Sequence, residues 1–469
     1  VEVERQLKKR QRGQAVRLEF EVGTSRFMRR FMTQEMNLEK EDMYQIDGPL
    51  DMTVFFGFCG IKGYNHLRYP EAHPHSPWSI LELKRTPETN IFDMIREKDL
   101  LIHLPYESFD ESVVNFLYSA ANDKDVLAIK QTLYRVSSSS PVVQALEKAV
   151  QNGKQVTVLM EVKARFDEAN NILMARRLEK AGAHVIYGLV GLKTHSKCTL
   201  VIRREKDGIR RYVHVATGNY NASTAKLYTD LGILTCNDRF GIDASAFFNL
   251  LSGYSDPPIW DSFIVAPINL RQRCIELIDR EIHFAKNGED AHMIAKMNSL
   301  LDKGIIEKLY EASQAGVKIE LIVRGICVLI PGIPGVSDNI TVRSIVGRFL
   351  EHSRIFWFRN GGREELYISS ADWMPRNLND RVELMVPIED PEIKRRLKQM
   401  VDIELSDNQK AHIMQADGTW LKTISAENQL CAQEYFQKIA EKRDAEDEMT
   451  LAQKLEPYTP VLGHGDGSD

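Results

Sequence analysis

Two short motifs place a histidine beside a cation, His195-Ser196-Lys197 and His352-Ser353-Arg354. Alternate residues of a strand share a face. In each motif we therefore expect the histidine and the cation to point the same way and the serine to take the opposite, structural face. A neutral imidazole is a good nucleophile at phosphorus, and a protonated imidazole can donate to a departing oxygen. Two such pairs in one cleft predict phosphoryl transfer.

Further cations stand near the ends of predicted strands. Arg135 follows the strand 127–134, Arg165 follows the strand 156–162, and Arg324 lies near the end of the strand 319–323. Guanidinium groups bind phosphoryl oxygens through two parallel hydrogen bonds. The cations expected to line one cleft with the two histidines are these three arginines and Lys130, Lys163, Lys197, Arg343 and Arg354.

Both motifs belong to an internal repeat. A helical pattern over 142–150 ends at Asn152-Gly153 and precedes a β-rich run, and a second pattern over 305–312 ends at Gly316 and precedes another. After each motif the sequence predicts a hairpin, with strands at 198–202 and 212–216, and at 355–358 and 366–369. We interpret the repeat as a duplicated α/β domain in pseudo-twofold arrangement, beginning near Asp99.

Outside the repeat the patterns are weaker. The segment 18–36 predicts a helix that the turn residues 46–49 follow, and the proline- and histidine-rich stretch 64–78 predicts an irregular loop. The polar, glycine-rich residues 457–469 predict a disordered tail. Histidines other than His195 and His352 are interpreted as surface or structural residues, except that His214, on the return strand beside His195, is left open.

Composition excludes several classes of protein. The 469 residues are 43% hydrophobic and 27% charged with a net charge of −5, which argues against a general nucleic-acid coat. Six cysteines form no C-x-x-C pair, so neither a disulfide framework nor a zinc site is indicated. The chain has no P-loop, no H-E-x-x-H and no EF-hand motif. It begins at Val1 with a charged stretch, and we expect a cytoplasmic fragment without its true N-terminus.

The motifs and their flanks resemble the phospholipase D superfamily, and within it the long, histidine-phosphorylated polyphosphate kinases of bacteria. The resemblance runs from the first residues to about residue 450. The stretches that carry it are 46–50, 104–109, 130–135, 162–168, 193–197, 217–221, 227–230, 323–327 and 351–354.

The resemblance implies a kinase that moves the terminal phosphate of ATP reversibly onto polyphosphate through a phosphohistidine. His195 would be the phosphorylated nucleophile, and His352 the second essential histidine, a nucleotide-site residue and general acid. Tyr228 and Arg324 would contact ATP. Arg135 and Arg165 would act with Mg²⁺, through the phosphates that carry it, because arginine has no lone pair to donate to a cation.

The resemblance also implies a domain plan. Residues 1–90 would be the remnant of a helical head domain, 91–262 and 263–455 two phospholipase D-like domains, and 456–469 a disordered tail. The partners would be ATP or ADP and inorganic polyphosphate, with no nucleic acid. The full-length protein would form a homodimer or homotetramer, and a peripheral membrane association is compatible with it. The fragment alone is expected to lack adenine contacts and so to be inactive.

One departure from the wider superfamily separates the alternatives. Phospholipases carry an aspartate seven residues after the histidine, where this chain has Ile202 and Arg359. The aspartate suits diester hydrolysis, so its loss counts against the alternative of a nuclease or a phospholipid-active phosphodiesterase. A third class, a non-catalytic polyphosphate-binding protein, would be expected to lose one of the two histidines, and both are present.

Overall fold

The computed structural model describes residue 5 and residues 13–77, 80–81, 89–137, 139–164, 167–189, 191–253 and 259–454, with the main chain alone from 444 onward. Arg165 and the predicted tail 456–469 lie outside these residues. The chain forms two compact units, Val1–Ala72 and His73–Asp469. None of the helices in the described part of the chain combines the length and the hydropathy needed to span a bilayer.

The first unit is small. Strands β1 (Leu18–Glu21) and β2 (Met43–Ile46) pair in parallel around helix α2 (Arg26–Met36), and the 3₁₀ helices η1 (Lys40–Asp42), η2 (Met52–Gly60) and η3 (Asn65–Leu67) follow. The helix predicted over 18–36 is thus wrong in its first part. The alternating residues of β1 pair with β2, and the helix begins only after Ser25, whose side chain accepts a hydrogen bond from the Met28 amide.

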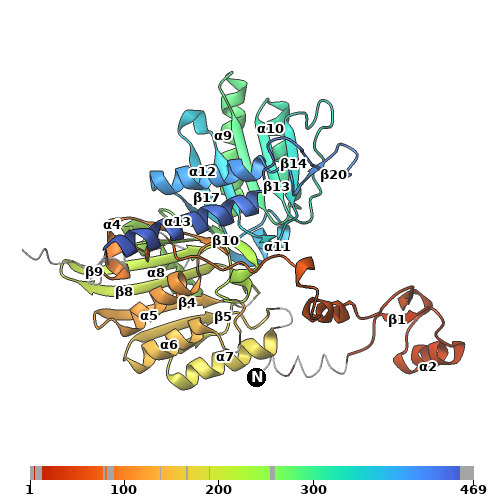
Figure 1. Ribbon diagram of the computed structural model, residues 1–469, viewed down its shortest axis with the longest axis horizontal. Helices are drawn as coiled ribbons and strands as arrows, with labels where there is room; N and C mark the ends of the chain where they lie inside the picture. Colours follow the sequence, from red (N-terminus) through yellow and green to blue (C-terminus); the bar gives the residue numbers. More distant parts are fainter. Residues whose placement is uncertain are drawn as a thin grey trace, which may run out of the picture. The chain divides into compact units, whose positions relative to one another are not determined.

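The second unit contains two mixed sheets with the same strand order (Figure 1). The first sheet runs β10-β9-β8-β4-β5-β6 with β3 beside β10, and the second runs β18-β17-β16-β12-β13-β14 with β11 beside β18. Each parallel pair in one sheet has a parallel counterpart in the other, as β4–β5–β6 and β12–β13–β14 show. The duplicated α/β fold is therefore confirmed.

The strands predicted from sequence are found as β4, β5, β8, β9, β13, β16 and β17, with ends that differ by a few residues, and the other strands of both sheets were not predicted. The first sheet is built from β3 (Leu100–Leu104), β4 (Val126–Leu133), β5 (Gln155–Met160), β6 (His184–Ile186), β8 (Lys197–Glu205), β9 (Gly208–Ala216) and β10 (Tyr228–Thr235). The second is built from β11 (Ile264–Ala266), β12 (His292–Met297), β13 (Lys318–Val323), β14 (Ile340–Ile345), β16 (Ile355–Phe358), β17 (Glu365–Ser369) and β18 (Arg381–Pro387), extended by β19 (Ala411–Met414) and β20 (Trp420–Lys422).

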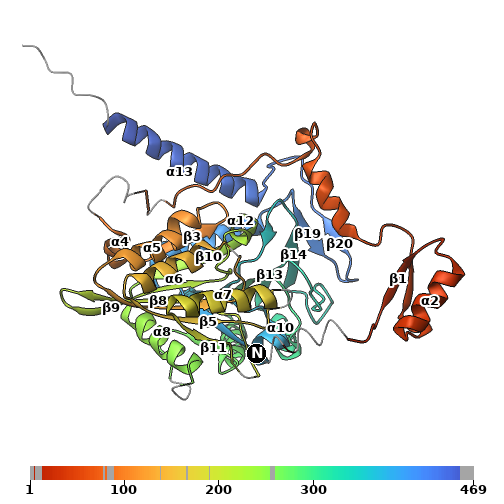
Figure 2. The same ribbon diagram turned by 90° about the horizontal axis from the view of Figure 1, so that it is seen from below.

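Helices cover the sheets. The first half contributes α4 (Ile91–Glu97), η4 (Asp110–Val114), α5 (Asn115–Asn122), α6 (Pro141–Gln151), α7 (Glu168–Ala181), η5 (Thr224–Lys226) and α8 (Asp238–Leu251). The second contributes α9 (Leu270–Lys286), α10 (Lys303–Gln314), η6 (Asn360–Gly362), α11 (Pro375–Asn379), α12 (Pro391–Leu405) and α13 (Ala432–Lys454). Figures 1 and 2 show α6 and α8 on opposite sides of the first sheet.

The two copies of the repeat begin their helices alike. Ser140 accepts a hydrogen bond from the Val143 amide at the start of α6, and Asp302 does the same for the Ile305 amide at the start of α10. Beneath α9 and α10, buried aliphatic side chains of β12 and β13 form the core of the second sheet. Both α6 and α10 were predicted from the spacing of their apolar residues and from Gly153 and Gly316 after them, and the two caps were not part of that prediction.

Two short strands cross between the halves. β7 (Lys193–Thr194) of the first half pairs in parallel with β18, and β15 (Leu350–Glu351) of the second half pairs in parallel with β10. The sequence-based expectation of an unbroken strand through each motif is wrong. The amides of His195 and Ser196 both donate to the Val382 carbonyl, and β8 begins only after them. This exchange of strands joins both sheets in one compact unit. The domain boundary predicted after residue 262 stays a prediction.

Candidate active site

The exchanged strands bring each motif histidine to a carboxylate of the other half. His195 Nδ1 lies 2.9 Å from both carboxylate oxygens of Glu383, the third residue of β18. The Ser370 hydroxyl donates to Glu383 Oε2 at 2.6 Å. The ring of Tyr134 meets the imidazole edge-on, with centroids 4.8 Å apart. A carboxylate at Nδ1 selects the tautomer with a proton there and leaves Nε2 with its lone pair.

Electrostatics keep His195 uncharged. Burial, followed by Lys197 and Arg381, holds the pKa of His195 well below its ordinary value. Burial raises the pKa of Glu383 to about 7, although Lys197 and Arg381 act in the opposite direction. A neutral imidazole with a free Nε2 is the form that can attack phosphorus.

His352 has the corresponding partner. Its Nδ1 lies 2.9 Å from both oxygens of Asp230, the third residue of β10, and Thr217 donates to Asp230 Oδ1 at 2.6 Å. Burial lowers the pKa of His352, and Asp230 opposes this effect. The Tyr228 ring lies beside the imidazole, with centroids 5.2 Å apart. The two histidines are close enough for His352 to lower the pKa of His195.

The cation of each motif is buried beside its histidine. Lys197 Nζ donates to the backbone carbonyl of His195, and burial lowers the pKa of Lys197 to about 7. Arg354 Nη1 donates to the backbone carbonyl of His352 at 2.6 Å, and Arg354 Nε donates to Asp372 at 3.1 Å. Each motif therefore holds its cation against its own histidine, as the spacing predicts.

A third cation joins the second motif. Arg324 donates from Nη2 to Asn298 Oδ1 at 2.7 Å and from Nε to the Glu351 carbonyl at 3.1 Å. Asn298 Nδ2 in turn donates to the His352 carbonyl at 3.1 Å. Arg324 thus belongs to a hydrogen-bonded network that includes Asn298 and the backbone carbonyls of Glu351 and His352.

The other predicted cations have different surroundings. Arg135 forms an ion pair with Asp167 at 2.7 Å and lies over the Tyr134 ring that touches His195. Lys130 donates to Asn249 at 3.4 Å, and Lys163 is exposed. Arg343 donates to the Leu405 carbonyl at the end of α12, so its described hydrogen bond belongs to a helix terminus.

Comparison with known proteins identifies the family. Family models match the polyphosphate kinase middle domain at residues 1–58, C-terminal domain 1 at 90–257 and C-terminal domain 2 at 263–433. The polyphosphate kinase of Halalkalibacterium halodurans is 54% identical over 413 residues, which are 87% of this chain and 58% of that protein. The polyphosphate kinase of Thermosynechococcus vestitus is 49% identical over 90% of this chain and 60% of that protein.

The chain belongs to the polyphosphate kinase family. It spans 58% and 60% of the length of these two relatives. The crystal structure of the Porphyromonas gingivalis polyphosphate kinase matches with a TM-score of 0.83 and 34% identity, covering 92% of this chain and 65% of that one. The fold expected from the resemblance is therefore confirmed for the second unit's mixed sheets, whereas a helical head domain is not described.

Sequence reasoning missed the groups that hold the two motif histidines. Glu383 and Asp230 were not proposed as partners, nor was Arg381, which lies 3.9 Å from Glu383 and lowers the pKa of His195. The one usable signal is positional, because both acids occupy the third position of equivalent strands. The repeat recognised in the sequence ends before β10 and β18, so it does not align these two strands.

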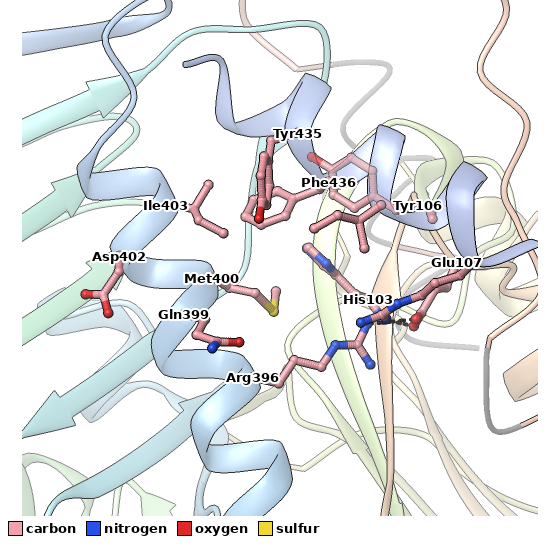
Figure 3. A pocket seen from close by; sticks show the side chains of 13 residues that line it. His103, Tyr106, Glu107, Arg396, Gln399, Met400, Asp402, Ile403, Tyr435 and Phe436 are labelled. Carbon is pink, nitrogen blue, oxygen red and sulfur yellow. Dashed lines mark hydrogen bonds and ion pairs between the residues drawn. The ribbon is translucent and has the colours of Figure 1, made fainter. Parts of the chain in front are cut away.

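A separate hollow lies away from the described contacts of the histidines. It has a volume of about 380 Å³ and lies between β3, α12 and α13, lined among others by His103, Arg396, Met400 and Phe436 (Figure 3). Arg396 pairs there with Glu107 at 2.7 Å. None of His195, His352, Glu383 and Asp230 lines this hollow.

Proposed function

We propose that the chain carries the phosphotransfer centre of a polyphosphate kinase, which moves the terminal phosphate of ATP reversibly onto inorganic polyphosphate through a phosphohistidine at His195. The single observation that carries this proposal is the neutral, buried His195 with Nδ1 on Glu383, because it leaves Nε2 as a nucleophile. Membership of the polyphosphate kinase family supports the choice of substrates.

In the first step His195 Nε2 forms a bond to the terminal phosphorus of ATP, and the bond from that phosphorus to the bridging oxygen breaks, so ADP leaves with the electron pair. In the second step a terminal oxygen of polyphosphate bonds to the same phosphorus, and the electron pair of the broken P–N bond returns to Nε2. Lys197, Arg354 and Arg324 neutralise the phosphoryl oxygens in both steps. The Glu383 carboxylate stabilises the positive charge that develops on the ring.

His352 is the proposed acid for the departing ADP oxygen. Burial lowers its pKa in the free site, but ATP brings several negative charges that favour the imidazolium form. The Asp230 carboxylate at Nδ1 favours the same form and leaves Nε2 to face the substrate. Tyr228, beside His352, is the proposed nucleotide contact.

The side chains around the site show whether the protein itself could ligate the expected Mg²⁺. Within the described residues no group of three or more histidine, cysteine or acidic side chains is placed to hold a metal ion. The carboxylates of Glu383, Asp230 and Asp372 already bind His195, His352 and Arg354. These residues do not fit a protein cage for Mg²⁺, so we derive no step through the ion. Lys130, Lys163, Arg135 and Arg165 stay proposals as contacts for phosphates that carry it.

Labelling tests the proposal. The longer protein that contains this chain is incubated with γ-³²P-ATP, and an acid-labile, base-stable label is expected on His195, together with long acid-insoluble polyphosphate. His195→Ala should abolish both, while replacement of the exposed His184 by alanine should change neither. Persistent labelling of His195→Ala would overturn the assignment, and release of alcohol from a phosphodiester substrate would favour the phosphodiesterase instead. Cytoplasmic location, peripheral membrane association and a homodimer or homotetramer stay predictions for the longer protein.

A further inference from the structure

One side chain of the last helix substitutes for a strand neighbour. Gln433, in the first turn of α13, is 3% exposed, and its amide accepts from the Phe349 N–H at 2.9 Å and donates to the Phe349 carbonyl at 2.9 Å. The same Nε2 donates to Glu351 Oε1 at 2.6 Å. Phe349 and Glu351 flank the first residue of β15, the short strand that ends immediately before His352. Gln433 therefore satisfies backbone groups on a strand edge that would otherwise be buried and unpaired.

The opposite edge of β15 is held by the first sheet. Leu350 pairs with Tyr228 and Glu351 with Thr229 of β10, the two residues immediately before Asp230. Thr229 Oγ1 donates to Glu351 Oε2 at 2.8 Å and accepts from the His352 amide at 3.2 Å. β15 thus lies between β10 on one side and the Gln433 amide on the other.

The Glu351 side chain also forms an ion pair with a buried lysine of the second sheet. Lys296 Nζ, buried in β12, binds Glu351 Oε2 at 2.7 Å and also binds Glu404 of α12. Burial acts to raise the pKa of Glu351, but Lys296, Gln433 and Thr229 outweigh it, so the pKa is lowered and the group is an anion at neutral pH. Three hydrogen-bond donors from three elements therefore converge on the carboxylate of Glu351, the residue before His352.

Gln433 approaches the chain before β15 closely. A Cβ on Gly347 would lie 2.4 Å from Gln433 Oε1, so only glycine lets the amide reach β15 at this point. Further along the helix, Tyr435, Phe436 and Ala440 line the hollow between α13 and α12 (Figure 3), and the buried Phe436 ring meets the rings of His103 and Tyr106, with centroids 5.1 and 5.5 Å apart. The first turn therefore contacts the strand that precedes His352, while Phe436 in the same part of the helix contacts β3 and the residues after it.

We propose that Gln433 is a positioning residue for His352: it fixes β15 from its free edge and so sets the place of the imidazole that faces ATP. The contribution of His352 to the reaction rests on the proposed function, but the positioning itself does not. Without the Gln433 amide, the backbone groups of Phe349 lose their partner, only β10 and the Arg324 bond to the Glu351 carbonyl still hold β15, and the peptide before His352 gains freedom. The imidazole then departs from the orientation that the Asp230 contact requires.

The test uses Gln433→Ala and Gln433→Glu. Alanine removes all three hydrogen bonds, and glutamate keeps the shape but can no longer donate and adds a negative charge beside Glu351. Lys438→Ala, at an exposed position of the same helix, is the matched control. Histidine ring nitrogens are observed by ¹⁵N NMR in the whole chain without substrate, so this measurement is independent of any activity.

In both Gln433 variants the ring signals of His352 should shift or broaden, while those of His195, held by Glu383 on the other half, stay in place. In the longer protein, the rate of phosphohistidine formation should fall at least tenfold with KM for ATP within about twofold, and the glutamate variant should lose more. Unchanged His352 signals in both variants would overturn the proposal. Shifted signals in a protein whose wild type never labels His195 would keep the positioning role and refute the proposed function.

Discussion

Replacing Glu383 by glutamine removes the charge that faces His195 while keeping the shape of the side chain. The N–O contact of 2.9 Å corresponds to roughly 6 kcal/mol between full unit charges at an effective dielectric constant of about 20. The pKa of Glu383 is about 7, so only part of the population carries the charge at neutral pH, and the ring gains only part of a unit charge. The expected loss of transition-state stabilisation is therefore about 2–4 kcal/mol, or roughly 30- to 1,000-fold in rate.

A second effect of Glu383→Gln also lowers the rate. The glutamine amide can turn its NH₂ toward Nδ1, which moves the imidazole proton to Nε2 and removes the nucleophilic lone pair. Rapid-quench measurement of phosphohistidine formation in the longer protein, at saturating ATP, measures the sum of both effects. Ser370→Ala leaves the Glu383 carboxylate in place but removes its hydrogen bond from Ser370, together with the bond that the Ser370 hydroxyl accepts from the Leu384 amide, and should cost less. Glu392→Gln, the same chemical change at an exposed position of α12, should leave the rate unchanged.

A Glu383→Gln rate within threefold of the wild type would refute the reasoning, because it would mean that neither the charge nor the tautomer of His195 limits phosphoryl transfer. A loss shared by Glu392→Gln would point instead to a general effect of removing one negative charge. Circular dichroism and thermal unfolding of each variant would show whether the fold is kept, so that a loss of rate can be assigned to the site.

The raised pKa of Glu383 predicts that the rate of His195 phosphorylation falls as the pH is lowered through about 7, because protonation removes the anion at Nδ1; this acid limb should be missing from the pH–rate profile of Glu383→Gln. In Gly218→Ala the new Cβ would lie 2.2 Å from the Asp230 carboxyl carbon, so Asp230 must move away from His352; phosphohistidine formation should fall at least tenfold, and urea unfolding should show a loss of about 1–3 kcal/mol. Lys296→Met leaves two buried carboxylates without their counter-charge, and the free energy of unfolding in urea should fall by about 3–5 kcal/mol; an unchanged midpoint would show that Glu351 needs no cation.

The sequence by itself determined the local elements and the repeat. The helix α6 was predicted because apolar residues recur at helical spacing over 142–150 and Asn152-Gly153 ends the pattern. The hairpins after each motif were predicted because strand segments and turn residues follow each other within a few positions. The pairing of a histidine with a cation two residues away is equally local, and the structure places Lys197 and Arg354 against their own histidines.

Only the tertiary structure decided what each histidine faces. His195 and Glu383 are 188 residues apart, and His352 and Asp230 are 122 residues apart. Neither pair leaves a trace in local periodicity, because the contact depends on β7 and β15 crossing to the opposite sheet. The same holds for Arg343, whose strand position predicts a charge near a sheet edge but not the helix terminus that it binds. Local spacing specifies which side of a strand a residue faces, whereas the partner on that side is set by the packing of the two halves.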